Sequence, residues 1–250
     1  MKQAMIFAAG LGTRLRPLTD HCPKALVQVG GKPMLQHLIE KLKVAGFEHL
    51  VVNVHHFADQ IVDFLSANDS FGMKIDISDE RGMLLETGGG IRQALPMFSS
   101  DSPILIHNVD IITDLDLFHF TQSANDMWLH NRGDAVLVVN ERKTSRYLLF
   151  DDDNILRGWT NVSTGTVKSP ISEFNPAVCH PKAFAGIHFI SPSLFSDFKP
   201  WSGAFSIIDF YLSLAASRSI VAYDAPQGMR WVDAGKPEAL ETAAAIVKGK

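Results

Sequence analysis

The sequence predicts an α/β fold, a single domain built on a twisted, mostly parallel mixed sheet with helices on its faces. Three observations lead to this prediction. Short apolar runs rich in β-branched residues alternate with segments that repeat apolar residues at the helical spacing. The chain has 250 residues, of which 46% are hydrophobic, and this is enough for one large core. A glycine-rich loop follows the first apolar run, where open α/β folds bind ligands.

The first 110 residues alternate between the two kinds of element. We expect strands at residues 4–9, 49–54, 73–78 and 103–108, and helices at residues 34–45, 59–67 and 90–97. The first of these helices repeats apolar residues at i, i+3 and i+4 and reaches Gly46, a residue type that commonly ends helices. Because strand–helix–strand units place consecutive strands parallel, this half predicts a wound parallel sheet.

The pattern changes after about residue 140. The run "YLLFDDDNILRGW" has two strand-like halves around an Asp/Asn turn, which predicts a hairpin with Asp151 to Asp153 at a solvated tip. The polar, proline-containing segment that follows predicts a small insertion or lid at about residues 148–182. Further strands are expected at 183–190 and 219–225, and helices at 205–217 and 237–247. No linker divides the chain, so we expect residues 1–250 to form one domain.

Composition narrows the class of protein. The formal net charge of −4 argues against general nucleic-acid binding or membrane-surface binding, since both usually require a basic face. No stretch approaches the roughly 20 apolar residues of a membrane span. The two cysteines, Cys22 and Cys179, are too few for a disulfide framework or a zinc cluster. A cytoplasmic protein is therefore expected; the oligomeric state is left open.

The loop "AAGLGTRLRPLT" has the chemistry of a phosphate site. Gly10 and Gly12 allow a tight turn whose backbone N–H groups face an anion, and Arg14 and Lys24 add fixed positive charge. A dinucleotide-binding fingerprint would need a small residue where Leu15 stands. A P-loop would need Gly-Lys-Ser/Thr, which is absent from the sequence. The loop therefore predicts phosphate binding at the carboxyl end of the first strand.

The same loop, followed by "PKAL", resembles the signature of the sugar-1-phosphate nucleotidyltransferases. The resemblance continues through "ETGGGI", "NVD", "FAGIHFISP" and "WVDAGKPE", so it covers almost the whole chain. It implies a Rossmann-like nucleotidyltransferase fold and an enzyme that makes a nucleoside-diphosphate sugar and pyrophosphate from a nucleoside triphosphate and a sugar 1-phosphate.

The branch of the family is indicated by "ETGGGI", at residues 86–91. This motif looks most like the uridylyltransferases that act on N-acetylmuramate 1-phosphate in cell-wall recycling. Guanylyltransferases for mannose 1-phosphate or heptose 1-phosphate usually read closer to "GTGGA", and they remain the alternative. A more remote alternative is a regulatory protein that binds nucleotides without turnover. The presence together of Arg14, Lys24, Asp110 and Asp233 argues against that last reading.

The resemblance also implies a mechanism and its catalytic residues. The sugar phosphate attacks the α-phosphorus of the triphosphate, and pyrophosphate leaves. Arg14 is implied to hold the β- and γ-phosphates, and Lys24 to lie against the α-phosphate. Asp110 and Asp233 are implied to bind one Mg²⁺, together with phosphate oxygens and water. Arg14, Lys24 and Asp110 are thus the expected catalytic residues.

Further residues are implied to surround the two substrates. The adjacent pair His55-His56 is expected beside the nucleotide rather than on a metal, and the helix opening at Thr87 to Gly90 is expected to read the base edge through its backbone. The segment "SEFNPAVCHPK" lacks the Glu-Lys-Pro of many hexose enzymes, so no contact to the sugar phosphate is identified. The nucleotide-binding set is Ala8, Ala9, Gly10, Gly12, Thr13, Arg14, Lys24, Asn53, Glu86, Gly88 and Gly89, and the sugar-binding pair is Asn108 and Gly186.

Overall fold

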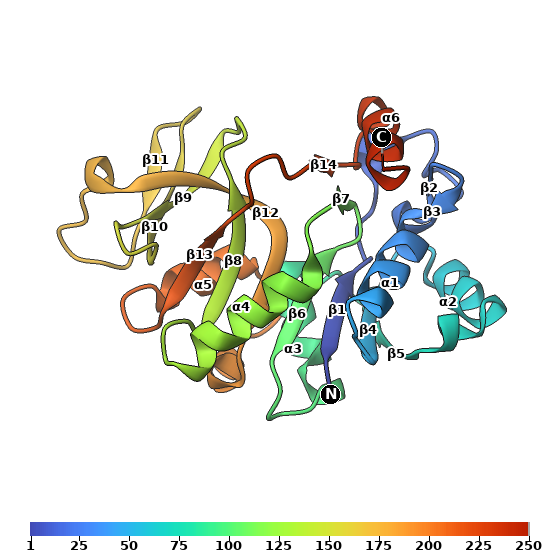
Figure 1. Cartoon of the computed structure of the whole chain (residues 1–250), viewed down its shortest axis with the longest axis horizontal. Helices are drawn as coiled ribbons and strands as arrows, with labels where there is room; N and C mark the ends of the chain where they lie inside the picture. The colour runs from blue at the N-terminus through green and yellow to red at the C-terminus, as the bar shows by residue number, and fades with distance from the viewer. Residues whose placement is uncertain (250) are drawn as a thin grey trace.

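The central sheet is organised around β1 (Gln3–Phe7), which runs parallel to β4 (His49–Val54) on one side and to β6 (Ile104–Asn108) on the other. A further strand, β5 (Lys74–Asp79), lies parallel beside β4. This computed structural model describes residues 1–249. Figure 1 shows the parallel strands in the right-hand half of the molecule, with the N-terminus at the start of β1. The carboxyl ends of these strands therefore meet at one edge of the sheet.

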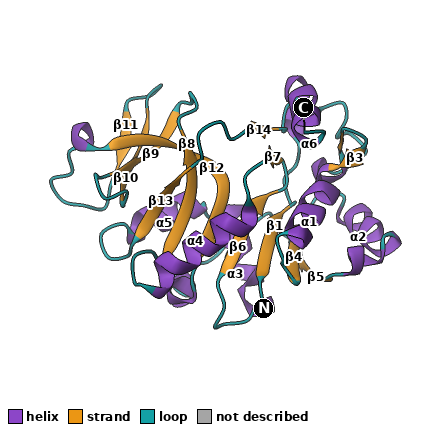
Figure 2. Ribbon diagram, in the orientation of Figure 1, coloured by secondary structure: helices purple, strands orange, loops and turns teal. Residues whose placement is uncertain are grey.

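Helices cover both faces of the sheet because successive side chains of each strand point to opposite sides. In β1, Ala4 and Ile6 belong to one hydrophobic core, and Met5 belongs to the other. The first core also receives α1 (Met34–Val44), α2 (Ala58–Ala67), α4 (Leu117–Leu129) and α6 (Leu240–Val247). The second receives α3 (Glu86–Ala94) and α5 (Ile207–Leu214). Figure 2 shows the helices arranged around the strands, and the predicted Rossmann-like α/β fold is confirmed.

The other half of the sheet is mostly antiparallel. Its long strand β12 (His180–Ile190) pairs with β6, with β8 (Ala135–Asn140) and with β9 (Arg146–Phe150). Beyond β9 the sheet continues to β10 (Leu156–Asn161) and β11 (Thr166–Lys168), while β13 (Ile220–Asp224) runs parallel to β8. A β-bulge in β12 shifts its register against β8 between Phe184 and His188, and Gly186 lies inside it with φ +77°.

Two short antiparallel pairs complete the strands. One joins β2 (Gln28–Val29) to β3 (Lys32–Pro33), and the other joins β7 (Ile111–Thr113) to β14 (Trp231–Asp233). In the second pair Asp233 stands opposite Ile111, and the N–H of Ala234 donates to the carbonyl of Asp110 at 2.8 Å. This pairing brings together two segments that are more than a hundred residues apart in the sequence.

Several elements differ from the expectations. The helix expected at 90–97 begins at Glu86 and ends at Ala94, after which the chain makes a 3₁₀ turn at Leu95–Met97 that contains Pro96. The helix expected at 237–247 opens with a 3₁₀ turn at Pro237–Ala239 and is α-helical from Leu240. Residues 111–140, which the patterns above left unassigned, hold β7, α4 and β8. Further 3₁₀ turns occur at Thr13–Leu15, Lys24–Leu26, Asp69–Gly72, Pro176–Val178 and Pro192–Phe198.

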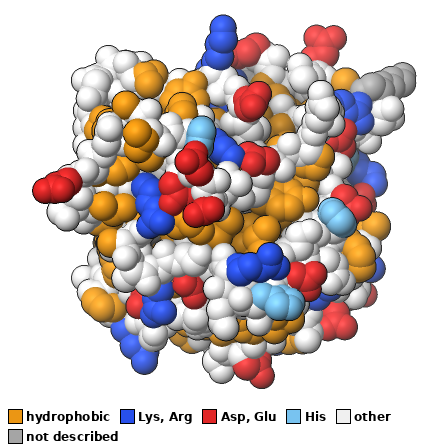
Figure 3. All heavy atoms as spheres, turned by 60° about the vertical axis from the view of Figure 1, so that its left-hand side comes forward, with side chains coloured by type: hydrophobic (Ala, Val, Ile, Leu, Met, Phe, Trp, Pro, Cys, Tyr) orange, Lys and Arg blue, Asp and Glu red, His pale blue; other side chains and the backbone are white. Residues whose placement is uncertain are grey.

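The surface carries both signs of charge. Figure 3 shows the face formed by the β9–β11 side of the molecule, where acidic and basic side chains alternate between apolar ones. The β9–β10 turn on this side is held by Asp151, whose carboxylate accepts from the N–H groups of Asp153 and Ile155 and from Arg157 Nε at 2.6 Å. No helix within residues 1–249 is both long enough and apolar enough to cross a membrane.

Candidate active site

A cleft of about 270 Å³ opens where β1, β4 and β6 end. The residues on its walls come from the glycine loop, from the ends of β4 and β6, and from the start of α3. Seven residues that the sequence predicted as site residues line it: Ala9, Gly10, Lys24, Asn53, Glu86, Asn108 and Asp110. Open α/β folds bind ligands at the carboxyl ends of their parallel strands. Both the position of the cleft and the residues that line it therefore indicate a ligand site.

The glycine loop holds its shape through Gly12 and Thr19. Gly12 has φ +65°, and a Cβ atom there would lie 2.9 Å from Thr19 Cγ2. The Thr19 hydroxyl donates to the Gly12 carbonyl at 2.8 Å. The 3₁₀ turn that follows, Thr13–Leu15, buries Leu15 and leaves Thr13 and Arg14 exposed. The buried Leu15 therefore anchors the loop to the core, while Arg14 is exposed to solvent.

Asn53 ties this loop to the end of β5. Its Oδ1 accepts from the backbone N–H groups of Ala8 at 2.7 Å and Ala9 at 3.3 Å, and its Nδ2 donates to Glu80 Oε1 at 2.7 Å. The other oxygen of Glu80 accepts from the N–H of Leu85 at 3.1 Å. Burial raises the pKa of Glu80, although these hydrogen bonds and the charge of His55 lower it. The N–H groups of Ala8 and Ala9 point into this network rather than toward the open cleft.

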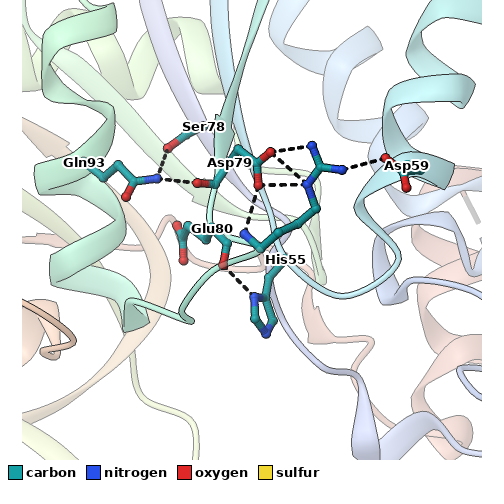
Figure 4. A network of polar contacts seen from close by, with 7 residues as sticks. His55, Asp59, Ser78, Asp79, Glu80 and Gln93 are labelled. Carbon is teal, nitrogen blue, oxygen red and sulfur yellow. Dashed lines mark hydrogen bonds and ion pairs between the residues drawn. The ribbon is translucent and has the colours of Figure 1, made fainter.

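A second polar network holds the segment that leads from β5 to α3 (Figure 4). His55 Nδ1 donates to the Glu80 carbonyl at 2.7 Å. Arg81 pairs with Asp79 and with Asp59. Gln93, on α3, donates to the carbonyl of Asp79 at 2.7 Å. His55 thus lies beside Glu80, which lines the cleft, and its Nδ1 is hydrogen-bonded to a backbone carbonyl.

The start of α3 places Glu86 and Thr87 on the cleft and the glycines behind it. Glu86 has φ +58°, a left-handed conformation that is strained for a residue with a side chain. The N–H groups of Gly88 and Gly89 both donate to the Phe205 carbonyl, at 2.8 and 3.3 Å, and both residues are buried. The expectation that the N–H groups of these glycines face a base is thereby corrected, because they are bonded to the segment before α5.

Two cations and two carboxylates meet at the edge of the cleft. Lys24 Nζ donates to Asp110 Oδ2, and both side chains are nearly buried. Arg14 pairs with Asp233, with Nη2 to Oδ2 at 3.2 Å. Burial raises the pKa of Asp110, which Lys24 lowers and Asp233 raises. Burial also raises the pKa of Asp233, but the N–H of Gly235 and the charges of Arg14 and Lys24 bring it below its ordinary value.

The carboxylates fit a divalent cation. A Cβ atom at Gly235 would lie 2.7 Å from Asp233 Oδ1 and 2.8 Å from Lys24 Nζ, which itself bonds Asp110, so the two carboxylates lie near each other. Within residues 1–249 there is no cluster of three or more acidic, histidine or cysteine side chains suited to a metal, so other ligands would come from substrate and water. Hard oxygen donors with few protein ligands suit Mg²⁺.

Asn108 and Gly186, the expected sugar-binding pair, lie side by side. A Cβ atom at Gly186 would lie 3.0 Å from Asn108 Nδ2 and 3.0 Å from Ile111 Cγ1. Gly186 belongs to the β12 bulge and Asn108 ends β6, so the two antiparallel strands bring them together. Asn108 lines the cleft, and Gly186 allows β12 to approach it.

Comparison with known proteins identifies the family. The family model described as nucleotidyl transferase matches residues 3–249. The N-acetylmuramate α-1-phosphate uridylyltransferase of Caulobacter vibrioides is 36% identical over 98% of this chain and 96% of its own length. The chain belongs to the nucleotidyl transferase family.

Other nucleotidyl transferases are also similar to the chain. The mannose-1-phosphate guanylyltransferase catalytic subunit β of Drosophila pseudoobscura is 29% identical over 94% of this chain and 60% of its own length. Among solved structures, HddC from Yersinia pseudotuberculosis superposes over both chains in full, with a TM-score of 0.73 and 25% identity. The Caulobacter uridylyltransferase thus exceeds the Drosophila guanylyltransferase subunit both in identity and in the share of its own length that is matched.

Three residues shape this nucleotidyl transferase site in ways that the sequence did not indicate: Glu80 and Gly235 were not selected as site residues, and Gly90 was expected at the base edge. Glu80 anchors Asn53, as described above. Gly90 makes room for that pair, since a Cβ atom there would lie 2.8 Å from Glu80 Oε1. Gly235 makes room for the ionic groups, since its Cβ would lie 2.7 Å from Arg14 Nη2 and 2.8 Å from Lys24 Nζ. Gly90 lies in the motif "ETGGGI" and Gly235 in "WVDAGKPE", so these two motifs were the sequence features that could have indicated them.

Proposed function

We propose that this chain transfers a uridylyl group from UTP to N-acetylmuramate 1-phosphate, forming a UDP-sugar and pyrophosphate. One observation carries the chemistry: two cation–carboxylate pairs, Lys24 with Asp110 and Arg14 with Asp233, lie together at the cleft where the parallel strands end. The similarity over almost the full length of the Caulobacter uridylyltransferase supports the choice of substrates.

The proposed reaction needs charge neutralisation more than proton transfer. A phosphate monoester is already ionised near neutral pH, so its oxygen attacks the α-phosphorus without a general base. The P–O bond to pyrophosphate breaks as the new P–O bond to the sugar phosphate forms. Negative charge therefore accumulates on oxygens, and fixed cations stabilise it.

Lys24 and Arg14 are the proposed cations. Lys24 is held in the cleft beside Asp110, where a compact ammonium suits the α-phosphate. Arg14 is exposed at the rim, where its planar guanidinium suits two oxygens of the leaving pyrophosphate. In the free protein both cations are already paired with carboxylates, so substrate binding exchanges their partners.

Asp110 and Asp233 are the proposed ligands of Mg²⁺. When bound there, the ion supplies charge neutralisation and polarises phosphate oxygens. The residues of the chain orient this site: Gly235 donates its N–H to Asp233 Oδ1 at 2.8 Å, and the β7–β14 pair fixes the backbone on both sides. A catalytic role for both carboxylates is part of the proposal.

The remaining residues are assigned to the nucleotide or to the sugar by their positions around the cleft. Ala9, Gly10, Asn53 and Glu86 border the nucleotide, and Asn108 with the Gly186 bulge borders the sugar. The segment 148–182, which extends the sheet at β9–β11, is the proposed lid or insertion on the sugar side. A cytoplasmic role in cell-wall recycling would accompany this substrate.

Pyrophosphate release from purified protein tests the proposal. UTP and GTP are each offered with N-acetylmuramate 1-phosphate, mannose 1-phosphate and heptose 1-phosphate, with and without Mg²⁺. We expect the highest kcat/KM with UTP and N-acetylmuramate 1-phosphate. Without Mg²⁺ we expect no pyrophosphate release. In thermal unfolding with Mg²⁺, UTP is expected to raise Tm more than GTP, because ligand binding stabilises the folded state. A preference for GTP with mannose 1-phosphate or heptose 1-phosphate would show that the protein is a guanylyltransferase. No turnover with any pair of substrates would favour a regulatory protein that binds nucleotides.

A further inference from the structure

Arg142 lies beside the proposed active site although no motif points to it. The residue follows the end of β8, and its Nη2 donates to the Phe184 carbonyl of the β12 bulge at 3.0 Å. Its guanidinium carbon lies 4.7 Å from the centroid of the Trp231 ring. Trp231 is on β14, the same three-residue strand that carries Asp233. Arg142 therefore reaches the strand of a proposed metal ligand from the opposite half of the sheet.

The side chain is held in place by the bulge of β12 and by β14. The carbonyls of two consecutive residues, Phe184 and Ala185, accept from Arg142 and from Trp231 Nε1, the latter at 2.9 Å. The indole thus has its own fixed partner and presents its face to the guanidinium, which is a favourable cation–π arrangement. Arg142 is consequently oriented by contacts that leave most of its donors free.

The guanidinium has more hydrogen-bond donors than protein acceptors. It carries five N–H groups. Among residues 1–249, the Phe184 carbonyl is the one acceptor bonded to it, and its Nε is buried without a partner. With the carboxylates of these described residues it forms no hydrogen-bonded ion pair, in contrast to Arg14 and Lys24. Burial lowers the pKa of Arg142, and the charge of Asp233 raises it. Partly buried charges are normally paired, so this cation is suited to an anion from a ligand.

We propose that Arg142 binds the phosphate of the sugar 1-phosphate and sets its position for attack. This inference rests on the proposed function. Arg14 and Lys24 approach from the end of β1, whereas β6 and β12 separate β8 from β1 in the sheet. Arg142 thus stands on the side of Asp233 that faces β12 and the β9–β11 extension, where the sugar is expected. Its position assigns it to the attacking phosphate rather than to the triphosphate.

Substitution of Arg142 tests this assignment through separate constants for the two substrates. In Arg142→Gln, the KM for the sugar 1-phosphate should rise by about 10- to 100-fold, the effect of losing a charge-assisted hydrogen bond. The KM for the nucleoside triphosphate should stay within about threefold of wild type. Arg142→Lys keeps the charge without the planar guanidinium, so its KM for the sugar 1-phosphate should lie between those of wild type and Arg142→Gln. The exposed Arg132, which precedes β8 at its opposite end, gives the control Arg132→Gln, which should match wild type.

Calorimetric titration with inorganic phosphate keeps the test independent of turnover. Arg142→Gln should weaken phosphate binding by about the same factor, and Arg132→Gln should leave it unchanged. Failure of the proposed function would appear as no pyrophosphate release by the wild type, with the phosphate result still readable. Equal KM values for the sugar phosphate in wild type and Arg142→Gln, or unchanged phosphate binding, would overturn the assignment. So would a variant whose only defect is a lower Tm.

The carboxylate of N-acetylmuramate is the competing anion, and a second ligand separates it from the phosphate. N-acetylmuramate without phosphate is measured as a competitive inhibitor against the sugar 1-phosphate. If Arg142 binds the phosphate, the inhibition constant of this compound should be the same in wild type and Arg142→Gln. A selective loss of N-acetylmuramate inhibition, with unchanged binding of inorganic phosphate, would contradict the proposal.

Discussion

The amide of Asn53 joins Glu80 to the glycine loop: Nδ2 donates to Glu80 Oε1 at 2.7 Å while Oδ1 accepts from the N–H of Ala8 at 2.7 Å. Both side chains are buried. Only a side chain with a donor and an acceptor at the same end serves both partners. The geometry of the first loop thus depends on a residue at the end of β4 and on another that follows β5.

Replacing Asn53 by Asp should destabilise the fold in a pH-dependent way. The variant keeps the acceptor for Ala8 but loses the donor to Glu80 and places two buried carboxyl groups together. We expect a loss of about 2–4 kcal/mol in unfolding free energy at pH 7. Because a shared proton relieves the repulsion, the folded pKa values are raised, and the loss should shrink as the pH falls toward 5. Urea unfolding at both pH values measures it, with Asn175→Asp as control, because Asn175 is exposed and its Oδ1 only accepts, from the N–H of Ala177. A loss that is equal at both pH values would contradict the pairing.

Gly235→Ala should reduce turnover far more than stability. The new methyl group would lie 2.7 Å from Arg14 Nη2 and from Asp233 Oδ1, and 2.8 Å from Lys24 Nζ. These are ends of side chains that can move aside, so the fold should survive while the ionic groups shift. Displacement of about 1 Å at reacting groups costs on the order of 100-fold in rate. Gly82→Ala, where a Cβ meets open space, is the matched control. Wild-type kcat in Gly235→Ala would show that this spacing is unimportant.

Asp110→Asn should lower turnover by about 10³-fold or more while the protein stays folded. An amide retains an oxygen acceptor for Lys24 but removes the negative charge that a divalent cation requires. Burial already disfavours the charged form of Asp110, so a neutral amide of the same shape should be tolerated. Turnover and Tm are compared with Asp20→Asn, which alters an exposed ion pair with Arg16. Near-normal turnover would exclude Asp110 from the mechanism.

Arg14→Lys should act on kcat more than on the KM for the triphosphate. The substitution preserves the charge but loses the two-pronged geometry that matches a leaving pyrophosphate. Steady-state kinetics at varied triphosphate concentration separate the two constants. If only the KM rises, Arg14 binds substrate and transition state equally and has no special role at the leaving group.

Acid should destabilise the protein through two buried histidines. Burial lowers the pKa values of His107 and His188 to about 3. Between that value and the ordinary pKa near 6.5, the unfolded chain binds protons that the folded chain excludes. Stability is therefore full above about pH 6.5 and falls by up to about 1.4 kcal/mol per pH unit for each histidine below it. Denaturant titrations at pH 7 and pH 5 should show a smaller drop for His188→Gln than for wild type. The exposed control His119→Gln should keep the wild-type drop.

The parallel half of the fold was predictable because its signals are local. The strand at His49–Val54 matches the expected bounds, since the run is apolar and bounded by polar or turn residues. The glycine loop likewise shows its chemistry in a few adjacent residues. By contrast, the β7–β14 pair has three residues per strand and no distinctive pattern. Its existence depends on packing between distant segments, which a local pattern does not contain.

The role of the glycines in α3 shows the same limit within the candidate site. The sequence predicts that Gly88 lets the backbone approach the edge of a base, whereas the segment before α5 lies against it. In the structure a Cβ atom at Gly88 would lie 2.3 Å from the Phe205 ring, a residue 117 positions later in the numbering. The expected charged groups at Arg14, Lys24 and Asp110 were identified because the motifs name them directly. Arg142 belongs to no quoted motif, and only the β12 bulge brings it into view.

The strand β12 divides the chain into two parts that can diverge separately. At one end it pairs with β9, which leads into the β9–β11 extension, and at the other it pairs with β6, which leads to Asp110. The extension enters and leaves the sheet through β9 and β12 without touching the pairing of β1, β4 and β5. Exchange of residues 148–182 between relatives should therefore change sugar selectivity while nucleotide binding is inherited intact. Under the proposed function, this arrangement would let the nucleotide-binding half stay constant while a single segment changes the acceptor.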